Sequence, residues 1–153
     1  MLVNSAVILL ARVCLVAMFP LSAVEKVIDW RAALAQASSS WLPGGPVLVV
    51  IAIAVEAITP VCIVTGWHDR LAAFLLAGFC VVTAFVYHPF WSFSHFWSDP
   101  HSDAREHFWQ FLKNFGHVGG LLLVVFAGSP APLAGVIADP LASSYPQALR
   151  PGP

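Results

Sequence analysis

Apolar runs that are long enough to cross a lipid bilayer dominate this sequence. Four of them lie at about residues 2–27, 47–66, 70–87 and 106–126. An α-helix rises about 1.5 Å per residue, so roughly 20 residues cross a hydrocarbon layer of about 30 Å. Inside that layer the backbone has no water to bind, and a helix satisfies its own N–H and C=O groups. The sequence therefore predicts an all-α membrane protein, built as a bundle of four transmembrane helices.

The composition of the chain supports the same class. Of its 153 residues, 59% are hydrophobic and 10% are charged, whereas a soluble domain has about 25% charged residues. The formal net charge is −1, which gives no basic surface for nucleic acid. We therefore expect the lipid bilayer to surround the protein, and we expect no nucleic-acid partner. The oligomeric state is left open by the sequence.

A change in composition follows the last apolar run. Six of the twelve prolines lie between Pro130 and Pro153. The short apolar stretch 133–138 is far below the length of a membrane span. We predict a transmembrane domain over residues 1–128 and a disordered, proline-rich tail over residues 129–153.

Two ionisable residues interrupt the apolar runs near their middles. Arg12 lies within the run 2–24, and Glu56 lies within the run 47–66. An unpaired charge at the centre of a spanning helix costs about 2.5–3.5 kcal/mol on insertion scales, so such residues face the bundle interior and find partners. Because the two residues are expected at a similar depth, the sequence predicts that Arg12 and Glu56 pair.

A second polar group is predicted near the end of the bundle that carries the two longer loops. Its members are Glu25, Lys26, His88, Lys113, Asn114 and His117. Helical periodicity places Arg12 and Lys26 on one face of the first helix. On the last helix it groups Glu106, Trp109, Lys113 and His117. We expect both faces to line the bundle interior.

Two interpretations of these interior polar residues remain open. In the first, they bind a polar head group, such as a quinone carbonyl, or an anion. In the second, they form ion pairs and hydrogen bonds that fix how the helices align, because removing one partner of a buried pair is costly. The sequence contains no Gly-rich phosphate loop, nucleophile elbow or H-E-x-x-H motif, so no catalytic residue is identified.

Six histidines raise the question of a metal site. Asp103 and His107 lie four residues apart and carry side chains that suit hard or borderline metals. No set of residues shows a definite ligand spacing, however. We therefore predict no metal site, with Asp103 and His107 as weak candidates.

Several short stretches point to a known family. They are FPLSAVEKVID at 19–29, GWHDRLAA at 66–73, HPFW at 88–91 and FLKNFGHVGG at 111–120, together with the glutamate at position 56. Taken together, they resemble the DoxX family of small bacterial membrane proteins with four helices. The resemblance covers roughly residues 8–126, and FLKN followed by the glycine pair is its most specific part. The family often has glycine where Ala23 stands, so helix packing at that turn is expected to differ.

The resemblance implies a function as well as a fold. Members are similar to the small subunit of an archaeal thiosulfate:quinone oxidoreductase, and mycobacterial relatives are implicated in membrane assemblies that handle oxidative stress. The family therefore implies a multi-pass protein of the bacterial inner membrane with both termini in the cytoplasm. It also implies quinone as a candidate ligand and redox proteins as candidate partners.

Three functions remain open from the sequence. The first is a membrane anchor or binding subunit of a redox-associated complex, without independent activity. The second is a catalytic subunit that passes electrons from a sulfur compound to quinone, with Glu56, His88 or His117 transferring protons. The third is a small transporter, for which a midplane pair of opposite charges is also expected. The sequence predicts none of the broken helices and inverted repeats of many transporters, which disfavours the third.

Overall fold

The computed structural model describes residues 2–93, 102–127 and 132–145. Every regular element in these ranges is helical. The protein is therefore all-α in the part that the structure describes, as the apolar runs predict.

The first expected helix is interrupted near its middle. It consists of α1 (Leu2–Val16) and α2 (Met18–Ile28), with a turn at Ala17 between them. Pro20 explains the position of the break. Its ring lacks an N–H and clashes with the carbonyl four residues earlier, which belongs to Val16. The proline is tolerated in the first turn of α2, where no intrahelical N–H is required.

Short connections set the bounds of the next three helices. The side chain of Asp29 accepts a hydrogen bond of 3.0 Å from the backbone N–H of Ala32 and begins α3 (Trp30–Ser38). The long apolar helix α4 (Gly45–Thr65) follows. It ends at Gly66, whose φ of 80° is readily available only to glycine. The helix α5 (Asp69–Tyr87) starts almost at once.

The second half of the chain contains a short 3₁₀-helix and two α-helices. The 3₁₀-helix η1 (Phe90–Ser92) follows α5, and α6 (Asp103–Phe126) returns along it. The short helix α7 (Pro132–Ala138) comes last. The prediction of a disordered tail is not confirmed for residues 132–145, because they form α7 and a folded segment after it. Residues 129–131 and 146–153 lie outside the described residues.

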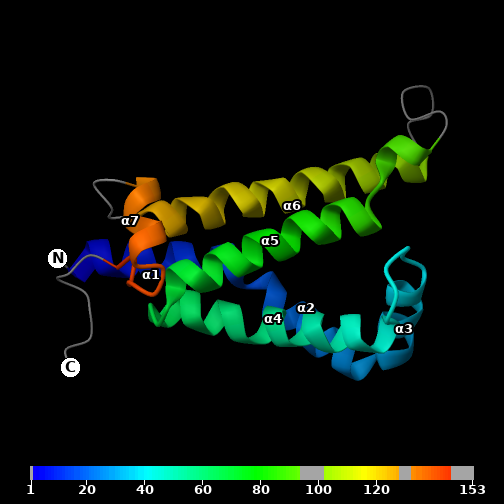
Figure 1. The fold of residues 1–153 in the computed structure, drawn as a ribbon, viewed down its shortest axis with the longest axis horizontal. Helices are drawn as coiled ribbons and strands as arrows, with labels where there is room; N and C mark the ends of the chain where they lie inside the picture. Colours follow the sequence, from blue (N-terminus) through cyan, green and yellow to red (C-terminus); the bar gives the residue numbers. More distant parts are fainter. Residues whose placement is uncertain (1, 94–101, 128–131, 146–153) are drawn as a thin grey trace.

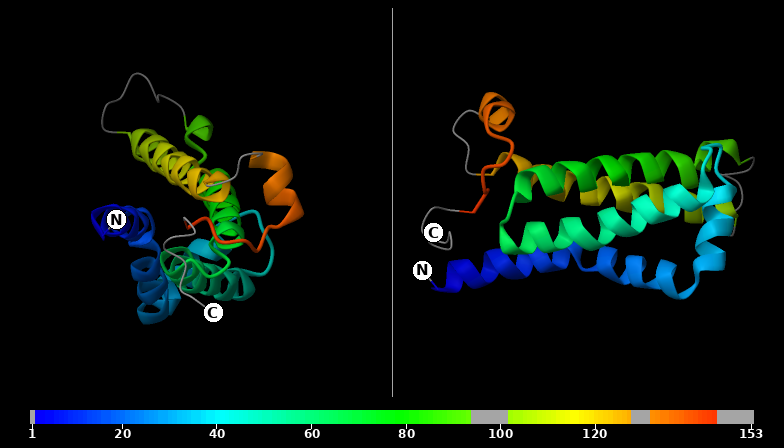
Figure 2. Two further views of the ribbon diagram at one scale, coloured as in Figure 1. Left: turned by 90° about the vertical axis from the view of Figure 1, so that its left-hand side faces the viewer. Right: turned by 60° about the horizontal axis from the view of Figure 1, so that its bottom comes forward.

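The long helices run roughly parallel or antiparallel to one another (Figure 1). α4 packs on α2 and α5, and α5 also packs closely along α6. Two views show α3 at one end of the bundle and α7 at the other, near the start of α1 (Figure 2). We call these the α3 end and the α7 end.

The main apolar core of the bundle lies toward its α7 end. Fully buried side chains there come from three helices and include Ile63, Leu76, Leu121 and Val125. They belong to the main apolar core. Toward the α3 end, α2, α3, α4, α5 and α6 border a cavity that is described below.

Three stretches in the described residues are long and apolar enough to cross a membrane: Ser5–Ile28, Gly45–Thr65 and Asp69–Ser92. Large apolar side chains on these stretches are exposed, among them Leu10, Leu21, Ile58 and Phe74. Such exposure is expected where lipid replaces water as the solvent. The predicted count of four spans is not confirmed, because the first half of α6 is too polar for that helix to be counted with these three.

Candidate functional site

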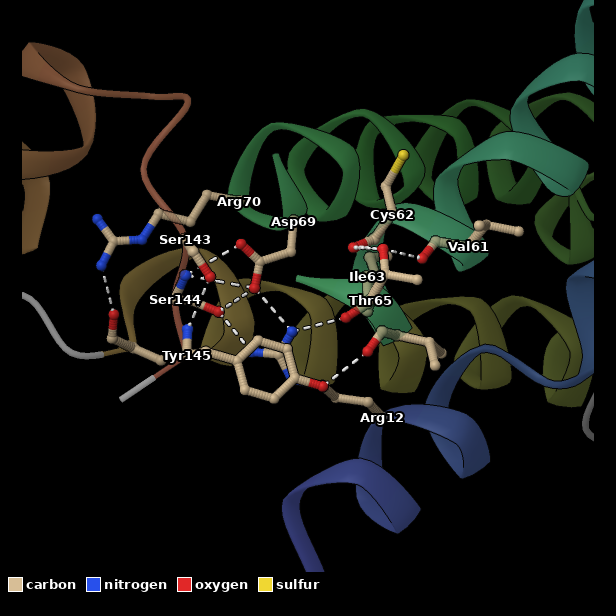
Figure 3. A network of polar contacts seen from close by, with 12 residues as sticks. Arg12, Val61, Cys62, Ile63, Thr65, Asp69, Arg70, Ser143, Ser144 and Tyr145 are labelled. Atoms are coloured by element: carbon tan, nitrogen blue, oxygen red, sulfur yellow. Dashed lines mark hydrogen bonds and ion pairs between the residues drawn. The ribbon is translucent and has the colours of Figure 1, made fainter. Parts of the chain in front are cut away.

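The polar side chains inside the bundle form two separate clusters. The first lies at the α7 end, around Arg12 of α1 (Figure 3). The Nη1 atom of Arg12 lies 2.7 Å from Oδ2 of Asp69 and donates a hydrogen bond of 2.6 Å to the carbonyl of Ile63. Its Nη2 atom donates to Oγ of Ser144 at 2.6 Å. The guanidinium carbon lies 3.7 Å from the centre of the Tyr145 ring.

Asp69 is the second charge of this cluster and the first residue of α5. Its side chain is fully buried. The backbone N–H of Ser144 donates to Oδ1 at 3.0 Å, and the Ser144 hydroxyl donates to Oδ2 at 2.6 Å. The start of a helix also favours a negative charge. The cluster thus satisfies both of its charges from within the chain.

The tyrosine that follows completes the contact between the C-terminal segment and the bundle. The Tyr145 hydroxyl donates a hydrogen bond of 2.7 Å to the carbonyl of Val64. Gly66 leaves room for the ring, because a Cβ at that position would lie 2.5 Å from Tyr145 Cδ2. We call residues 141–145 the strap.

The predicted pair of Arg12 with Glu56 is wrong. Arg12 reaches α4 at Ile63, which lies seven residues, or about two helical turns, beyond Glu56. The prediction matched the midpoints of two apolar runs, but the length of a run does not fix its register against a neighbouring helix. Packing of α1 on α4, and the break at Ala17, decide which residues meet.

Glu56 belongs to the second cluster, toward the α3 end. Its carboxylate lies 2.8 and 3.0 Å from the Lys26 ammonium, through Oε2 and Oε1. The Ser22 hydroxyl donates to Oε1 at 3.3 Å. Ser22 and Lys26 are four residues apart on α2 and therefore share a face. Glu56 is 5% exposed and lies near the middle of α4.

A cavity of about 300 Å³ lies beside this pair. It is bounded by α2, α3, α4, α5 and α6, and apolar side chains such as Val49, Phe79 and Val82 form most of its wall. The polar side chains that line it are Ser22, Lys26, Gln36, Glu56, Thr83, Tyr87, His88, Gln110 and Asn114. The result is an apolar chamber with polar groups contributed by several helices.

Only part of the second predicted group meets at this cavity. Lys26, His88 and Asn114 line it, and they are joined by Glu56. Glu25 and Lys113 are exposed instead. His117 is half-buried and packs edge-on against Phe19, with 5.4 Å between ring centres.

The predicted interior face of the last helix is also wrong in part. Trp109 is 58% exposed, and Glu106 and Lys113 are exposed as well. The buried stripe of α6 contains Ala104, Leu121 and Val125. The prediction followed polar residues, whereas small and apolar residues set the face that packs on α5.

A pair of histidines lies where α5 ends. His88 follows α5 directly, and its Nδ1 lies 3.3 Å from Nδ1 of His107 on α6. Phe93 stacks on the His107 ring, with 4.9 Å between centres. Among the described residues, no group of three or more metal-ligating side chains comes together, and Asp103 is exposed.

Sequence reasoning missed several residues of these clusters. Ser22 could have been found, since it precedes Lys26 by one helical turn. Asp69 stands in the sequence analysis only as part of the stretch GWHDRLAA at 66–73. Ser144 and Tyr145 lie in a proline-rich segment that carries no periodic signal, so nothing local indicated their contact with Arg12.

The fold and the buried polar residues define a helical membrane protein. A family model described as DoxX matches residues 7–89, which is more than half of the chain, and the chain belongs to this family. The match confirms the resemblance seen in the sequence, although the FLKN stretch lies beyond the matched residues. No curated protein and no solved structure gave a match.

The matched region includes both charged pairs, Arg12 with Asp69 and Lys26 with Glu56. It also includes His88. The strap and α6 lie outside it. The two clusters therefore combine residues of the family region with residues from the rest of the chain.

Proposed function

We propose that this DoxX family protein is a membrane subunit of a redox-associated complex and binds a quinone in its interior cavity. The observation that carries the proposal is the position of the Lys26–Glu56 pair. It lies in the wall of an apolar cavity at mid-depth of α4.

The energetic argument starts from the cost of buried charge. An ion pair inside a bundle loses much of its hydration, and the mutual attraction only partly offsets that loss. Ionisable residues inside membrane segments are rare, and they mark ligand or ion sites more often than they add stability. A pair that lines a cavity is therefore better explained by a ligand than by packing alone.

The shape and chemistry of the cavity suit a quinone head group. Small-molecule pockets have volumes of about 300–1,000 Å³, with mainly apolar walls and a few placed polar groups. A quinone has an apolar ring with carbonyl acceptors at its edges. Asn114 on α6 offers a donor, because its Nδ2 group has two N–H bonds and gives one of them to the carbonyl of Gln110 at 3.0 Å. Ser22 and Lys26 on α2 already donate to Glu56.

The proposal extends to the arrangement in the membrane. We propose α6 as the fourth span, because its 24 residues can cross the hydrocarbon layer. Together with the family resemblance, four spans favour a bacterial inner-membrane protein with both termini in the cytoplasm. The redox role and the partner proteins also rest on the family resemblance.

A binding experiment tests the quinone site. Wild-type protein in lipid nanodiscs is titrated with a short-chain benzoquinone or naphthoquinone, and binding is followed by quenching of tryptophan fluorescence. We expect saturable binding, weakened at least tenfold by Asn114→Leu, because a hydrogen-bond donor to the carbonyl is lost. Lys113→Leu is the matched control, since its exposed side chain lies outside the cavity.

The outcomes separate the proposed functions. Absence of saturable binding, or equal weakening by both variants, contradicts the quinone site. Affinity purification followed by mass spectrometry tests the complex, and a reproducible lack of partners contradicts the subunit role. Quinone reduction by the purified chain with thiosulfate or sulfite would make it a catalytic subunit instead.

A further inference from the structure

We propose that His88 and His107 form a proton path between the interior cavity and the α3 end of the bundle. The inference rests on the proposed quinone site and adds a role for a residue outside it. A quinone that is reduced to a quinol takes up protons together with electrons. The electrons would come from the redox partner, and the protons need a route of their own.

The packing of the bundle limits where such a route can run. Toward the α7 end, a second hollow of about 640 Å³ lies between α1 and α6, but none of its lining residues lines the interior cavity. The apolar core around Ile63, Leu76 and Leu121 also lies toward that end. Beyond it, the charges of Arg12 and Asp69 are bound to each other and to the strap. A proton would therefore reach the cavity from the α3 end, where His88 and His107 lie.

The geometry of the pair suits proton transfer. His88 lines the cavity, whereas His107 does not. The two Nδ1 atoms are 3.3 Å apart, so one imidazole donates its N–H to the bare nitrogen of the other. Phe93 stacks on His107, and the end of α5 fixes the backbone of His88 through its N–H to the carbonyl of Ala84 at 3.1 Å.

The proton balance of one transfer follows from the two nitrogens of each ring. When His107 donates Nδ1–H to His88, a proton that arrives at Nε2 of His107 makes it an imidazolium. The Nδ1 proton then passes to His88, and His88 releases its Nε2 proton to the ligand. One proton enters and one leaves, and exchange of the two tautomers restores the starting state.

Among the residues that the structure describes, few charged groups lie around the pair. Glu106, next to His107 on α6, is the carboxylate whose charge acts on His88. Asp103 and Arg105 are exposed on the first turn of the same helix. On the cavity side the charged residues are Lys26 and Glu56, which bind each other.

A flash experiment on the full chain tests the path. A hydroxynaphthoquinone, whose colour changes when its hydroxyl ionises, is bound to the protein in nanodiscs. A photoacid flash then lowers the pH of the medium, and the absorbance reports protonation of the bound probe. We expect His107→Ala to slow this protonation by about tenfold or more, because loss of an acid–base relay has effects of this size or larger.

Two controls distinguish a relay from a structural role. His68→Asn replaces a histidine at the opposite end of the bundle, with a residue that tolerates its positive φ, and should leave the rate unchanged. Added imidazole should restore the rate in His107→Ala, whereas it cannot repair a packing defect. The dissociation constant of the probe should stay within about twofold in both variants, since neither residue lines the cavity.

Slow protonation in His107→Ala that imidazole restores supports the path. An unchanged rate in His107→Ala, a slow rate that imidazole leaves unaltered, or equal slowing in His68→Asn overturns it while the quinone site stands. Failure of the probe to bind wild-type protein overturns the quinone site and the path together.

Discussion

Arg12 and Asp69 lie 57 residues apart in the sequence and form an ion pair with 2.7 Å between Nη1 and Oδ2. The pair joins the first helix to the start of α5. Arg12 also donates to the carbonyl of Ile63 and to Ser144 of the strap, and Ser144 donates in turn to Asp69. Polar contacts therefore join the helices at the α7 end, beside a hollow between α1 and α6, whereas the cavity that Lys26 and Glu56 line lies toward the α3 end.

Removal of one partner of this pair should destabilise the protein strongly. Arg12→Leu leaves the Asp69 carboxylate buried without its counter-charge, which costs about 3–5 kcal/mol. The double variant Arg12→Leu with Asp69→Leu should lose less stability, because it leaves no unpaired charge in the bundle. Thermal unfolding in detergent measures both. An equal or larger loss in the double variant would contradict the pairing, and Arg31→Leu, at an exposed position of α3, is the control.

The strap should stabilise the bundle although it lies outside the region that matches the family. Ser144→Ala removes the hydroxyl that bridges Arg12 and Asp69, and we expect a loss of about 1–3 kcal/mol in unfolding free energy. A chain that ends at Pro140 should lose more unfolding free energy than Ser144→Ala does, because it lacks the whole strap. A chain that ends at Tyr145 keeps the described contacts and serves as the reference. Equal melting temperatures for the two truncated chains would show that the strap contributes nothing.

Gly66 should tolerate no side chain. Its φ is 80°, and a Cβ would lie 2.5 Å from the Tyr145 ring. We expect Gly66→Ala to cost about 1–3 kcal/mol from backbone strain, with the steric clash in addition. Gly116→Ala, in open space on α6, should be neutral or stabilising.

A double variant separates the two causes at Gly66. Tyr145→Ala removes the ring, so Gly66→Ala should cost less in that background than in the wild type. Chemical denaturation of the wild type, the two single variants and the double variant gives the coupling free energy between the two positions. No coupling would mean that the ring and the turn do not touch in solution.

The Lys26–Glu56 pair should behave like its counterpart at the α7 end. Lys26→Met strands the Glu56 carboxylate in the cavity wall, and we expect a loss of several kcal/mol in stability. The double variant Lys26→Met with Glu56→Met should regain part of the stability that Lys26→Met loses. Glu25→Met, one position earlier and exposed, is the control. If Glu25→Met lowers the melting temperature as much as Lys26→Met, the pair has no special role.

Much of this protein could be predicted from patterns that are local in sequence. Apolar runs of sufficient length predict helices and a membrane environment, because both depend on short stretches of chain. The resemblance to the DoxX family was also visible in short stretches. The proline at position 20 and the glycine at position 66 are also local features, and they explain where the structure breaks or ends a helix.

The tertiary structure alone decided which polar residues meet. Arg12 could not be assigned to Asp69 from the sequence, because the register between two helices depends on how their side chains pack. Ser144 gave no local signal of its contact, since a strap is ordered by the surface it binds. Lys26 and Glu56 were candidate ligand residues from the sequence, but only the packing of five helices placed them together in the wall of one cavity. The sequence thus determined the helices and their membrane environment. Packing between residues far apart in the sequence placed the charges and shaped the site.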